Sequence, residues 1–376
     1  MAIKVLISVL TLIFLVTGCS FNNEPPEAFS TGIEKIKMKW APEKRTAVFD
    51  VVPSYADGEW TISGETTVPE AWDAIDSLVK EIFAGEKIVM DFALLPPAEF
   101  ADTTQAVVNV SVGNLRREPR HAAELVDQVV MGMELKLLKA KSYWYFVQTP
   151  SGYLGWITRG SLTRMGATEI GKWRQADKYV MNENLGHIYS KPSEGSQVVT
   201  DLVLGSVFIK KEGSGTWREV ELPDGRAGFV HRDRIVNFQE ANNRRFPDRK
   251  AIVDRAKTMM GVPYLWGGNS TKGLDCSGFS GTVYRAEGYQ LPRDANMQVK
   301  EGEEVVPNAD YANVFPGDLI FFGPPDRVTH VGICLGGSYF IHSSDDVHIN
   351  SLDEKDELFN AYRKRTFRHI KRIIKD

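Results

Sequence analysis

The chain has 376 residues, a length that predicts two to four domains rather than a single core. Hydrophobic residues make up 43% and charged residues 25% of the sequence, a balance typical of globular rather than disordered proteins. The formal net charge of -4 gives no reason to expect nucleic acid as a partner. Three cysteines without a C-x-x-C pair exclude a disulfide framework and do not indicate a structural zinc site.

The first residues indicate export. "MAIKVLISVLTLIFLVTGCS" begins with a positive charge at Lys4, continues with an apolar run over residues 5–16 that is short for a membrane span, and ends in small residues. This pattern predicts a signal peptide over residues 1–18. The "VTGC" motif resembles a bacterial lipobox, which implies cleavage before Cys19, lipid attachment to its sulfur, and a lipoprotein anchored to a membrane of the cell envelope. The alternative is an ordinary signal peptide with an incidental cysteine.

Residues 19–102 are expected to form a lipid-anchored tether followed by a helical segment. The tether is polar and proline-bearing and reaches about residue 35. The run "TVPEAWDAIDSLVKEIF" then predicts a helix, with Thr67 as a possible cap and Pro69 in the first turn. Its apolar side chains share one helical face: Trp72, Ile75, Val79 and Ile82.

The middle of the chain repeats itself at an offset of 73 residues. "PSGYLGWI" matches "PDGRAGFV" at this offset, which also relates Trp144 to Trp217. Each unit holds short alternating runs separated by glycine turns, so each predicts a small β-barrel or sandwich. The pattern resembles bacterial SH3-like domains, which implies units at residues 103–168 and 176–238 that bind cell-wall peptide or pack against an enzyme.

A polar linker over residues 239–250 leads into the last domain, at residues 245–376. Near its start, "LDCSGFS" places Cys276 between an aspartate and a serine, before an apolar helix. Asp275 stands where a helix cap belongs, so Cys276 falls in the first turn. Free N–H groups and the helix dipole favour thiolate at that position, which predicts a nucleophile with a lowered pKa. The alternative is a small buried side chain without a chemical role.

A nucleophilic cysteine needs a base, and "RVTHVGICLGGSYFIHSS" supplies two histidines on a predicted hairpin. With a three-residue loop over residues 336–338, His330 and His342 share one sheet face; an even loop would separate them unless a bulge compensated. We therefore expect His330 as base and His342 as the residue that orients it. Cys334, in mid-strand without capping context, is predicted to be core. A zinc site built from Cys276 and these histidines would lack a fourth ligand.

These motifs together resemble the NlpC family of papain-like cell-wall peptidases: "PYLWGG", "DCSG", "PRDANMQ", "PGDLIFF", "HVGI" and "FIHSS" follow in the family's order. The resemblance implies an α+β chain in which a papain-like domain, with the cysteine helix packed on an antiparallel sheet, follows two SH3-like barrels. It assigns Cys276, His330 and His342 to catalysis and needs no cofactor. By the same resemblance Tyr264 lies near the oxyanion, and three residues line a D-glutamyl site: Trp266, Asp275 and Ser277.

Two SH3-like units before such a domain resemble γ-D-glutamyl-L-diamino acid endopeptidases, which implies murein peptides with a free N-terminal L-alanine as substrates. The residues matching that family's amine pocket are Asp294, Glu124 and Tyr153, and carboxylates would suit a desolvated ammonium. Packing and solvation are the alternative roles for Glu124 and Tyr153. Ala295 departs from the serine common in the family. The rival functions are an endopeptidase on intact crosslinked wall and a non-catalytic wall-binding lipoprotein.

Overall fold

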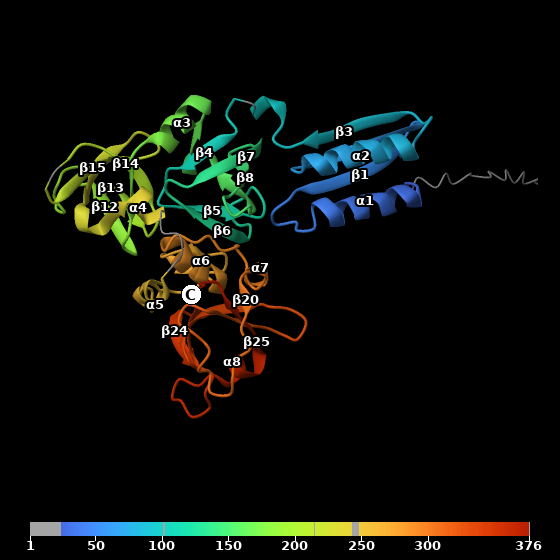
Figure 1. Ribbon diagram of the computed structural model, residues 1–376. Coiled ribbons are helices and arrows are strands. Elements are labelled where there is room, and N and C mark those ends of the chain that lie inside the picture. Colours follow the sequence, from blue (N-terminus) through green and yellow to red (C-terminus); the bar gives the residue numbers. More distant parts are fainter. Residues whose placement is uncertain (1–23, 101, 214, 243–247, 376) are drawn as a thin grey trace, which may run out of the picture.

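The computed structural model describes residues 24–100, 102–213, 215–242 and 248–375. The predicted signal peptide and Cys19 lie outside the described residues. Within the described ranges, no helix is long and apolar enough to span a bilayer. Figure 1 shows an N-terminal α/β unit, two β units and a C-terminal domain, with the first β unit lying between the N-terminal unit and the second β unit and above the C-terminal domain.

The N-terminal unit packs two helices on a small sheet. Its elements are α1 (Glu27–Trp40), β1 (Phe49–Ala56), β2 (Glu59–Thr66), α2 (Pro69–Ile82) and β3 (Ile88–Leu94). The strand order is β1-β2-β3, with β1 antiparallel and β3 parallel to β2. Six buried side chains form its core: Phe29, Ile62, Ile75, Val79, Phe83 and Phe92.

This unit corrects two expectations. The tether was predicted to reach about residue 35, but α1 begins at Glu27. Phe29, Ile33 and Ile36 lie at helical spacing on one face of α1 and pack on the core of this unit, so the apolar pattern of a helix was present in the sequence. At α2, Val68 rather than Thr67 occupies the N-cap position, with no side-chain cap bond, and Pro69 starts the helix.

The two β units have the same topology. The first contains β4 (Gln105–Val108), β5 (Val112–Arg116), β6 (Leu125–Val130), β7 (Glu134–Lys141), β8 (Trp144–Gln148), β9 (Leu154–Thr158) and β10 (Leu162–Met165). Helix α3 (Ala167–Gln175) leads to the second, which contains β11 (Lys178–Met181), β12 (Leu185–Tyr189), β13 (Val198–Val203), β14 (Val207–Lys210), β15 (Trp217–Glu221), β16 (Ala227–His231) and β17 (Ile235–Asn237).

Their sheet orders are β10-β4-β7-β8-β9-β5-β6 and β13-β12-β16-β15-β14-β11-β17, which are identical when corresponding strands are matched. Strand β15 begins 73 residues after β8, and β16 begins 73 residues after β9, so the repeat in the sequence is a repeat of structure. Gly132 and Gly205, also 73 apart, both adopt a left-handed backbone with φ of 83° and 85°. That conformation explains the repeated glycine.

The C-terminal domain packs a helix against an antiparallel sheet. Helix α4 (Phe238–Asn242) occupies the start of the predicted linker, and α5 (Arg249–Thr258) is capped by Asp248. A short hairpin, β18 (Asn269–Ser270) and β19 (Gly273–Leu274), precedes α6 (Cys276–Ala286), and α7 (Ala295–Gln298) follows it. The sheet comprises β20 (Glu303–Glu304), β21 (Leu319–Phe322), β22 (His330–Gly336), β23 (Tyr339–Ser343), β24 (Val347–Ser351) and β25 (Phe367–Arg372), with α8 (Ala361–Thr366) before β25.

The sheet order is β20-β25-β21-β22-β23-β24, and α6 packs on β22 and β23. Three side chains of α6, Phe279, Val283 and Tyr284, have no exposed surface, and burying each contributes about 1.5–3 kcal/mol. This packing fixes the first turn of α6, with Cys276, against the end of β22 that carries His330. The α+β class predicted for the chain is confirmed.

Candidate active site

Cys276 is the first residue of α6, as its sequence context predicted. Asp275 is the N-cap residue, and its Oδ1 accepts a hydrogen bond from the backbone N–H of Gly278 at 2.7 Å. The backbone N–H groups of Ser277 and Val331 also face the sulfur of Cys276 and favour its thiolate. Val331 directly follows His330 in β22, so the sulfur lies at the end of the strand that carries the candidate base.

The lowered pKa expected for Cys276 is wrong. Burial raises the pKa of the thiol to about 12, and the neighbouring carboxylate of Asp275 adds to the shift. Cys276 is 8% exposed, so the loss of hydration outweighs the N–H groups at the helix start. Burial and the guanidinium of Arg363 likewise hold the pKa of His330 well below its ordinary value. Burial therefore favours the uncharged form of both side chains, a thiol and an imidazole.

The two histidines meet on one face of the sheet. His330 Nε2 lies 2.8 Å from His342 Nδ1, and both side chains are buried. Ile333 pairs with Ile341 across the hairpin, which is the register predicted from the sequence. Burial lowers the pKa of His342 to about 3. Both rings are therefore uncharged near neutral pH, and the hydrogen bond between them needs one ring to donate its N–H and the other to accept at its unprotonated nitrogen.

The hairpin reaches this register by a different loop from the one expected. Instead of a three-residue loop, Gly336 pairs with Tyr339, and Gly337 and Ser338 form a two-residue turn. Leu335 is the extra residue of a β-bulge, at which the register shifts. The extra residue of the bulge makes up for the shorter turn, so the number of residues between the paired strand positions stays odd. Both histidine side chains therefore point to the same face of the sheet.

A chain of hydrogen bonds fixes which nitrogen of each ring carries the proton. The backbone N–H of Arg363 donates to Asn360 Oδ1 at 3.0 Å, so the Nδ2 of Asn360 is the group that donates to Asn350 Oδ1, at 2.9 Å. The same Asn350 oxygen lies 3.0 Å from His342 Nε2, which must therefore donate. A neutral His342 then accepts at Nδ1 from His330 Nε2–H. His330 is left with an unprotonated Nδ1, the form a general base requires.

Sequence reasoning missed Asn350 and Asn360. The signal was present for Asn350, because β24 pairs with β23 so that His348 faces His342. Asn350 lies two residues further on the same face, diagonal to His342. His348 contacts His342 edge to face, with ring centroids 4.5 Å apart, and pairs with Asp346 rather than joining the hydrogen-bond chain. Cys334 is buried in β22, the core position expected for it.

A cleft of about 360 Å³ lies between the first β unit and the C-terminal domain. All the predicted substrate-binding residues line it together with Cys276 and His330, whereas His342 lies behind His330; the lining set includes Tyr264, Trp266, Asp275, Ser277, Asp294, Glu124 and Tyr153. Burial raises the pKa of the Tyr264 hydroxyl to about 12, so it stays protonated and able to donate. A larger cavity of about 500 Å³, between the two β units and α6, has none of these residues in its lining.

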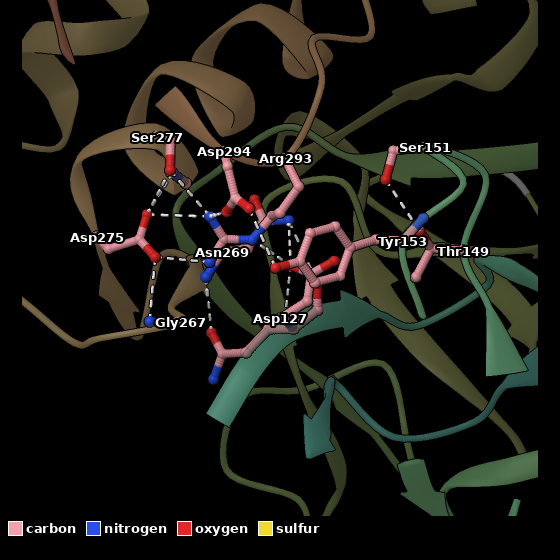
Figure 2. Close-up of polar contacts among 12 residues, drawn as sticks. Asp127, Thr149, Ser151, Tyr153, Gly267, Asn269, Asp275, Ser277, Arg293 and Asp294 are labelled. Carbon is pink, nitrogen blue, oxygen red and sulfur yellow. Dashed lines mark hydrogen bonds and ion pairs between the residues drawn. The ribbon is translucent and has the colours of Figure 1, made fainter. Parts of the chain in front are cut away.

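A buried ion network joins the two domains beneath this cleft (Figure 2). Arg293 donates to Asp275 through Nη2 at 2.6 Å and to Asp127 of β6 through Nε at 2.7 Å. Arg293 is 4% exposed, so its charge depends on these carboxylate partners rather than on water. Asn269 of β18 donates to Asp127 as well, at 2.9 Å. The sequence reasoning missed Arg293 although it lies inside the "PRDANMQ" motif, and nothing local marked Asp127.

The network occupies the carboxylate of Asp275. Its oxygens accept from Gly267 N–H, Ser277 Oγ and the Arg293 guanidinium in addition to the helix cap. The Asp275 carboxylate is therefore already hydrogen-bonded within the protein, and Ser277, which shares this network, donates its hydroxyl hydrogen to Asp275 at 3.1 Å.

The three residues expected to form an amine pocket, Asp294, Tyr153 and Glu124, all line this cleft. Tyr153 Oη donates to Asp294 Oδ2 at 3.1 Å across the domain interface, as Figure 2 shows. Trp266 Nε1 donates to Glu124 Oε1 at 3.0 Å, also across the interface. Among the described residues, no group of three or more histidine, cysteine, aspartate or glutamate side chains is arranged to hold a metal ion.

Comparison with known proteins defines the class. The NlpC/P60 family profile matches residues 261–371, and the bacterial dipeptidyl-peptidase SH3 domain profile matches residues 115–162. The chain therefore carries an NlpC/P60 cysteine peptidase domain preceded by a bacterial dipeptidyl-peptidase SH3 domain, and it is an enzyme of that peptidase family.

Individual relatives agree with this class. Dipeptidyl-peptidase 6 of Lysinibacillus sphaericus is 28% identical over 263 residues, which cover 68% of this chain and 94% of that protein. The gamma-D-glutamyl-L-lysine dipeptidyl-peptidase of Bacillus subtilis (strain 168) is 28% identical over 57% of this chain and 71% of its own length. A murein DD-endopeptidase and LD-carboxypeptidase of Escherichia coli (strain K12) is 33% identical over 34% of this chain and 63% of its own length.

Among solved structures, an NlpC/P60 family protein from Bacillus cereus ATCC 10987 matches with a TM-score of 0.63 at 21% identity. The match covers 72% of this chain and all of that chain. It supports the papain-like fold with SH3-like units upstream.

Proposed function

We propose that this enzyme hydrolyses the γ-D-glutamyl-L-diamino acid bond of murein peptides that carry a free N-terminal L-alanine. The observation that carries the proposal is a hydrogen bond across the domain interface, which Tyr153 of the first β unit donates to Asp294 of the peptidase domain. Both residues line the cleft that also contains Cys276. The names of the relatives, which include gamma-D-glutamyl-L-lysine dipeptidyl-peptidases, support the same substrate class.

In the proposed reaction the Cys276 thiol gives its proton to His330 Nδ1 as its sulfur attacks the γ-carbonyl carbon of D-glutamate. The raised thiol pKa makes this transfer part of the attack rather than a prior ionisation. The Tyr264 hydroxyl donates to the developing oxyanion. His330 then protonates the departing amine of the diamino acid, and water hydrolyses the thioester with His330 again as base.

His342 holds the His330 ring through the 2.8 Å hydrogen bond between them. It does not contact the substrate in this scheme, because it lies behind His330 and outside the cleft lining. Its contribution is the tautomer and orientation of the base.

At the far end of the cleft, the substrate ammonium would bind next to Asp294, Tyr153 and Glu124. An ammonium taken out of water needs carboxylate and hydroxyl oxygens around it, and this end of the cleft offers them. The first β unit forms part of the wall of this cleft, and the hydrogen bond from Trp266 to Glu124 joins it to the peptidase domain. A glycan attached to the alanine nitrogen would remove the positive charge and extend into this wall, so intact wall would be excluded.

The test compares L-Ala-γ-D-Glu-L-Lys with its N-acetylated form, and repeats both with diaminopimelate in place of lysine. The wild type should cleave the free-amine peptides and leave the acetylated ones largely uncut. Y153F should lower kcat/KM for the free-amine peptides, and D294N should lower it by about a hundredfold, the effect of about 3 kcal/mol when a buried ion loses its charged partner. Y143F, an exposed tyrosine of the same unit, is the matched control.

Equal cleavage of acetylated and free-amine peptides would replace this proposal by an endopeptidase that acts on intact wall. The 33% identity with the E. coli murein endopeptidase makes that the second candidate. Digestion of purified sacculi, with release of peptides measured by chromatography, separates the two.

We also propose export and lipid anchoring through Cys19, on the strength of the "VTGC" motif. Mass spectrometry of the mature N-terminus tests this, with diacylglycerol on Cys19 as the expected result. C19A should then appear in the soluble fraction, and an unmodified mature N-terminus in the wild type would contradict the anchor.

A further inference from the structure

The N-terminal α/β unit reaches into the proposed substrate pocket. The segment between α1 and β1 lies on the first β unit, where Leu154 N–H donates to Arg45 O at 2.8 Å and Gln148 Nε2 donates to Thr46 O at 2.9 Å. These bonds involve main-chain atoms of the segment. The backbone at Arg45 is therefore held in place whatever side chain it carries.

The Arg45 side chain extends across the domain interface to the peptidase domain. Its Nη1 donates to Asp294 Oδ2 at 2.5 Å and to Asn296 Oδ1 at 3.0 Å. Asp294 Oδ2 is the same oxygen that accepts from Tyr153, so a guanidinium occupies the carboxylate that the proposed function assigns to the substrate ammonium. Arg45 also lines the cleft.

Arg45 has a second carboxylate partner in its own segment. Its Nε donates to Glu43 Oε1 at 2.7 Å and its Nη2 to Glu43 Oε2 at 2.5 Å, a bidentate pair. The side chain is 26% exposed, so it lies at the mouth of the pocket and not within its floor. The guanidinium can therefore leave Asp294 while Glu43 still holds its charge.

Two cations compete for one carboxylate at this position. Asp294 carries one negative charge, and an ammonium that binds beside it meets the guanidinium at close range. At the other side of the pocket Arg117 Nε pairs with Glu124 at 2.7 Å, so that carboxylate is also neutralised in the substrate-free protein. The substrate must displace or share a built-in cation to be bound through its amine.

We propose that Arg45 is a specificity-determining residue whose guanidinium competes with the substrate's N-terminal ammonium for Asp294. When substrate binds, the guanidinium leaves Asp294 and stays paired with Glu43. The inference rests on the proposed amine pocket and adds the N-terminal unit to it. The segment lies outside both regions matched by family profiles. The competition sets the KM for free-amine peptides and leaves the chemistry at Cys276 unchanged.

The experiment measures kcat and KM for L-Ala-γ-D-Glu-L-Lys with the full chain. R45A should lower KM about threefold to tenfold with kcat unchanged, because Asp294 is freed, and R45K should stay near the wild type because a cation remains. E43Q should raise KM, because Asp294 is then the remaining carboxylate partner of Arg45. R120A, which breaks an exposed ion pair with Glu118 elsewhere on the first β unit, is the control.

The double variant R45A/E43Q separates competition from a direct role of Glu43. Under the proposal it behaves like R45A, since Glu43 acts only through Arg45. An unchanged or raised KM in R45A, or a KM in R45K that falls as far as in R45A, with a wild type that still prefers the free amine, overturns the role of Arg45 and leaves the proposed function standing. A wild type that cuts acetylated and free-amine peptides equally overturns the amine pocket itself, and the competition with it.

Discussion

Replacing Asn350 tests the hydrogen-bond chain behind the catalytic base. Asn350 Oδ1 accepts from His342 Nε2 at 3.0 Å, and His342 is 1% exposed. In N350L the Nε2–H loses its acceptor in a buried place, which costs about 1–3 kcal/mol. The other tautomer of His342, protonated at Nδ1, then becomes competitive, and it can no longer accept from His330.

His330 responds by moving its own proton to Nδ1, where it cannot receive a proton from Cys276. A tautomer shift of about 1.4 kcal/mol reduces the competent form about tenfold. We therefore expect kcat/KM of N350L for L-Ala-γ-D-Glu-L-Lys to fall about tenfold or more at pH 7.5. Y339F, an exposed residue at the far end of the same hairpin, should keep wild-type activity.

The variant N350D distinguishes tautomer control from simple packing. A carboxylate accepts from His342 Nε2–H as the amide does, so the competent tautomer remains. Its charge raises the pKa of His342 and of His330, and because the base must be neutral to act, the acid limb of the pH profile should move to higher pH. Wild-type kcat/KM in N350L, with the thermal midpoint unchanged, would refute the tautomer argument.

Three further predictions follow from burial and charge. The alkylation rate of Cys276 by iodoacetamide should rise continuously from pH 6 to pH 10, because the pKa of the thiol is raised to about 12. A plateau in this rate below pH 8 would contradict the neutral thiol. In the cleavage assay, C276A should abolish activity while C334A retains most of it. R293M should lower the free energy of unfolding by about 3 kcal/mol or more in urea titrations, because two buried carboxylates lose their cation. A change within the error of the titration would show that the network contributes little to stability. The pKa values of His330 and His342 are lowered in the folded protein, so the unfolded chain binds protons that the folded chain does not. The free energy of unfolding should therefore fall as the pH drops below 6.5, by about 2 kcal/mol per histidine at pH 5. H342Q should weaken this pH dependence.

The residue pattern within single helices, hairpins and repeats was enough to locate those parts of the site that depend on one such element. The capped helix start gave the position of Cys276, the 73-residue offset gave the paired β units, and parity along the hairpin put His330 and His342 on one face. These features depend on hydrogen bonds and periodicities within a few residues, which a sequence displays directly. The loop differs from the predicted three-residue loop: the turn has two residues, and Leu335 forms a bulge that supplies the extra residue.

Family resemblance carried the prediction further than pattern did. The grouping of Asp294, Tyr153 and Glu124 came from resemblance alone, since the three lie in different domains and no spacing connects them. All three line one cleft because the first β unit docks on the peptidase domain.

The tertiary structure alone decided what depends on solvent exclusion and on contacts between distant segments. The thiol of Cys276 has a raised pKa because neighbouring elements bury it, a cost that the helix start cannot reveal. Arg45 meets Asp294, 249 positions away, because the N-terminal unit docks on the first β unit. Desolvation and ion pairing are properties of the assembled surfaces, so neither can be obtained from the order of residues in one segment.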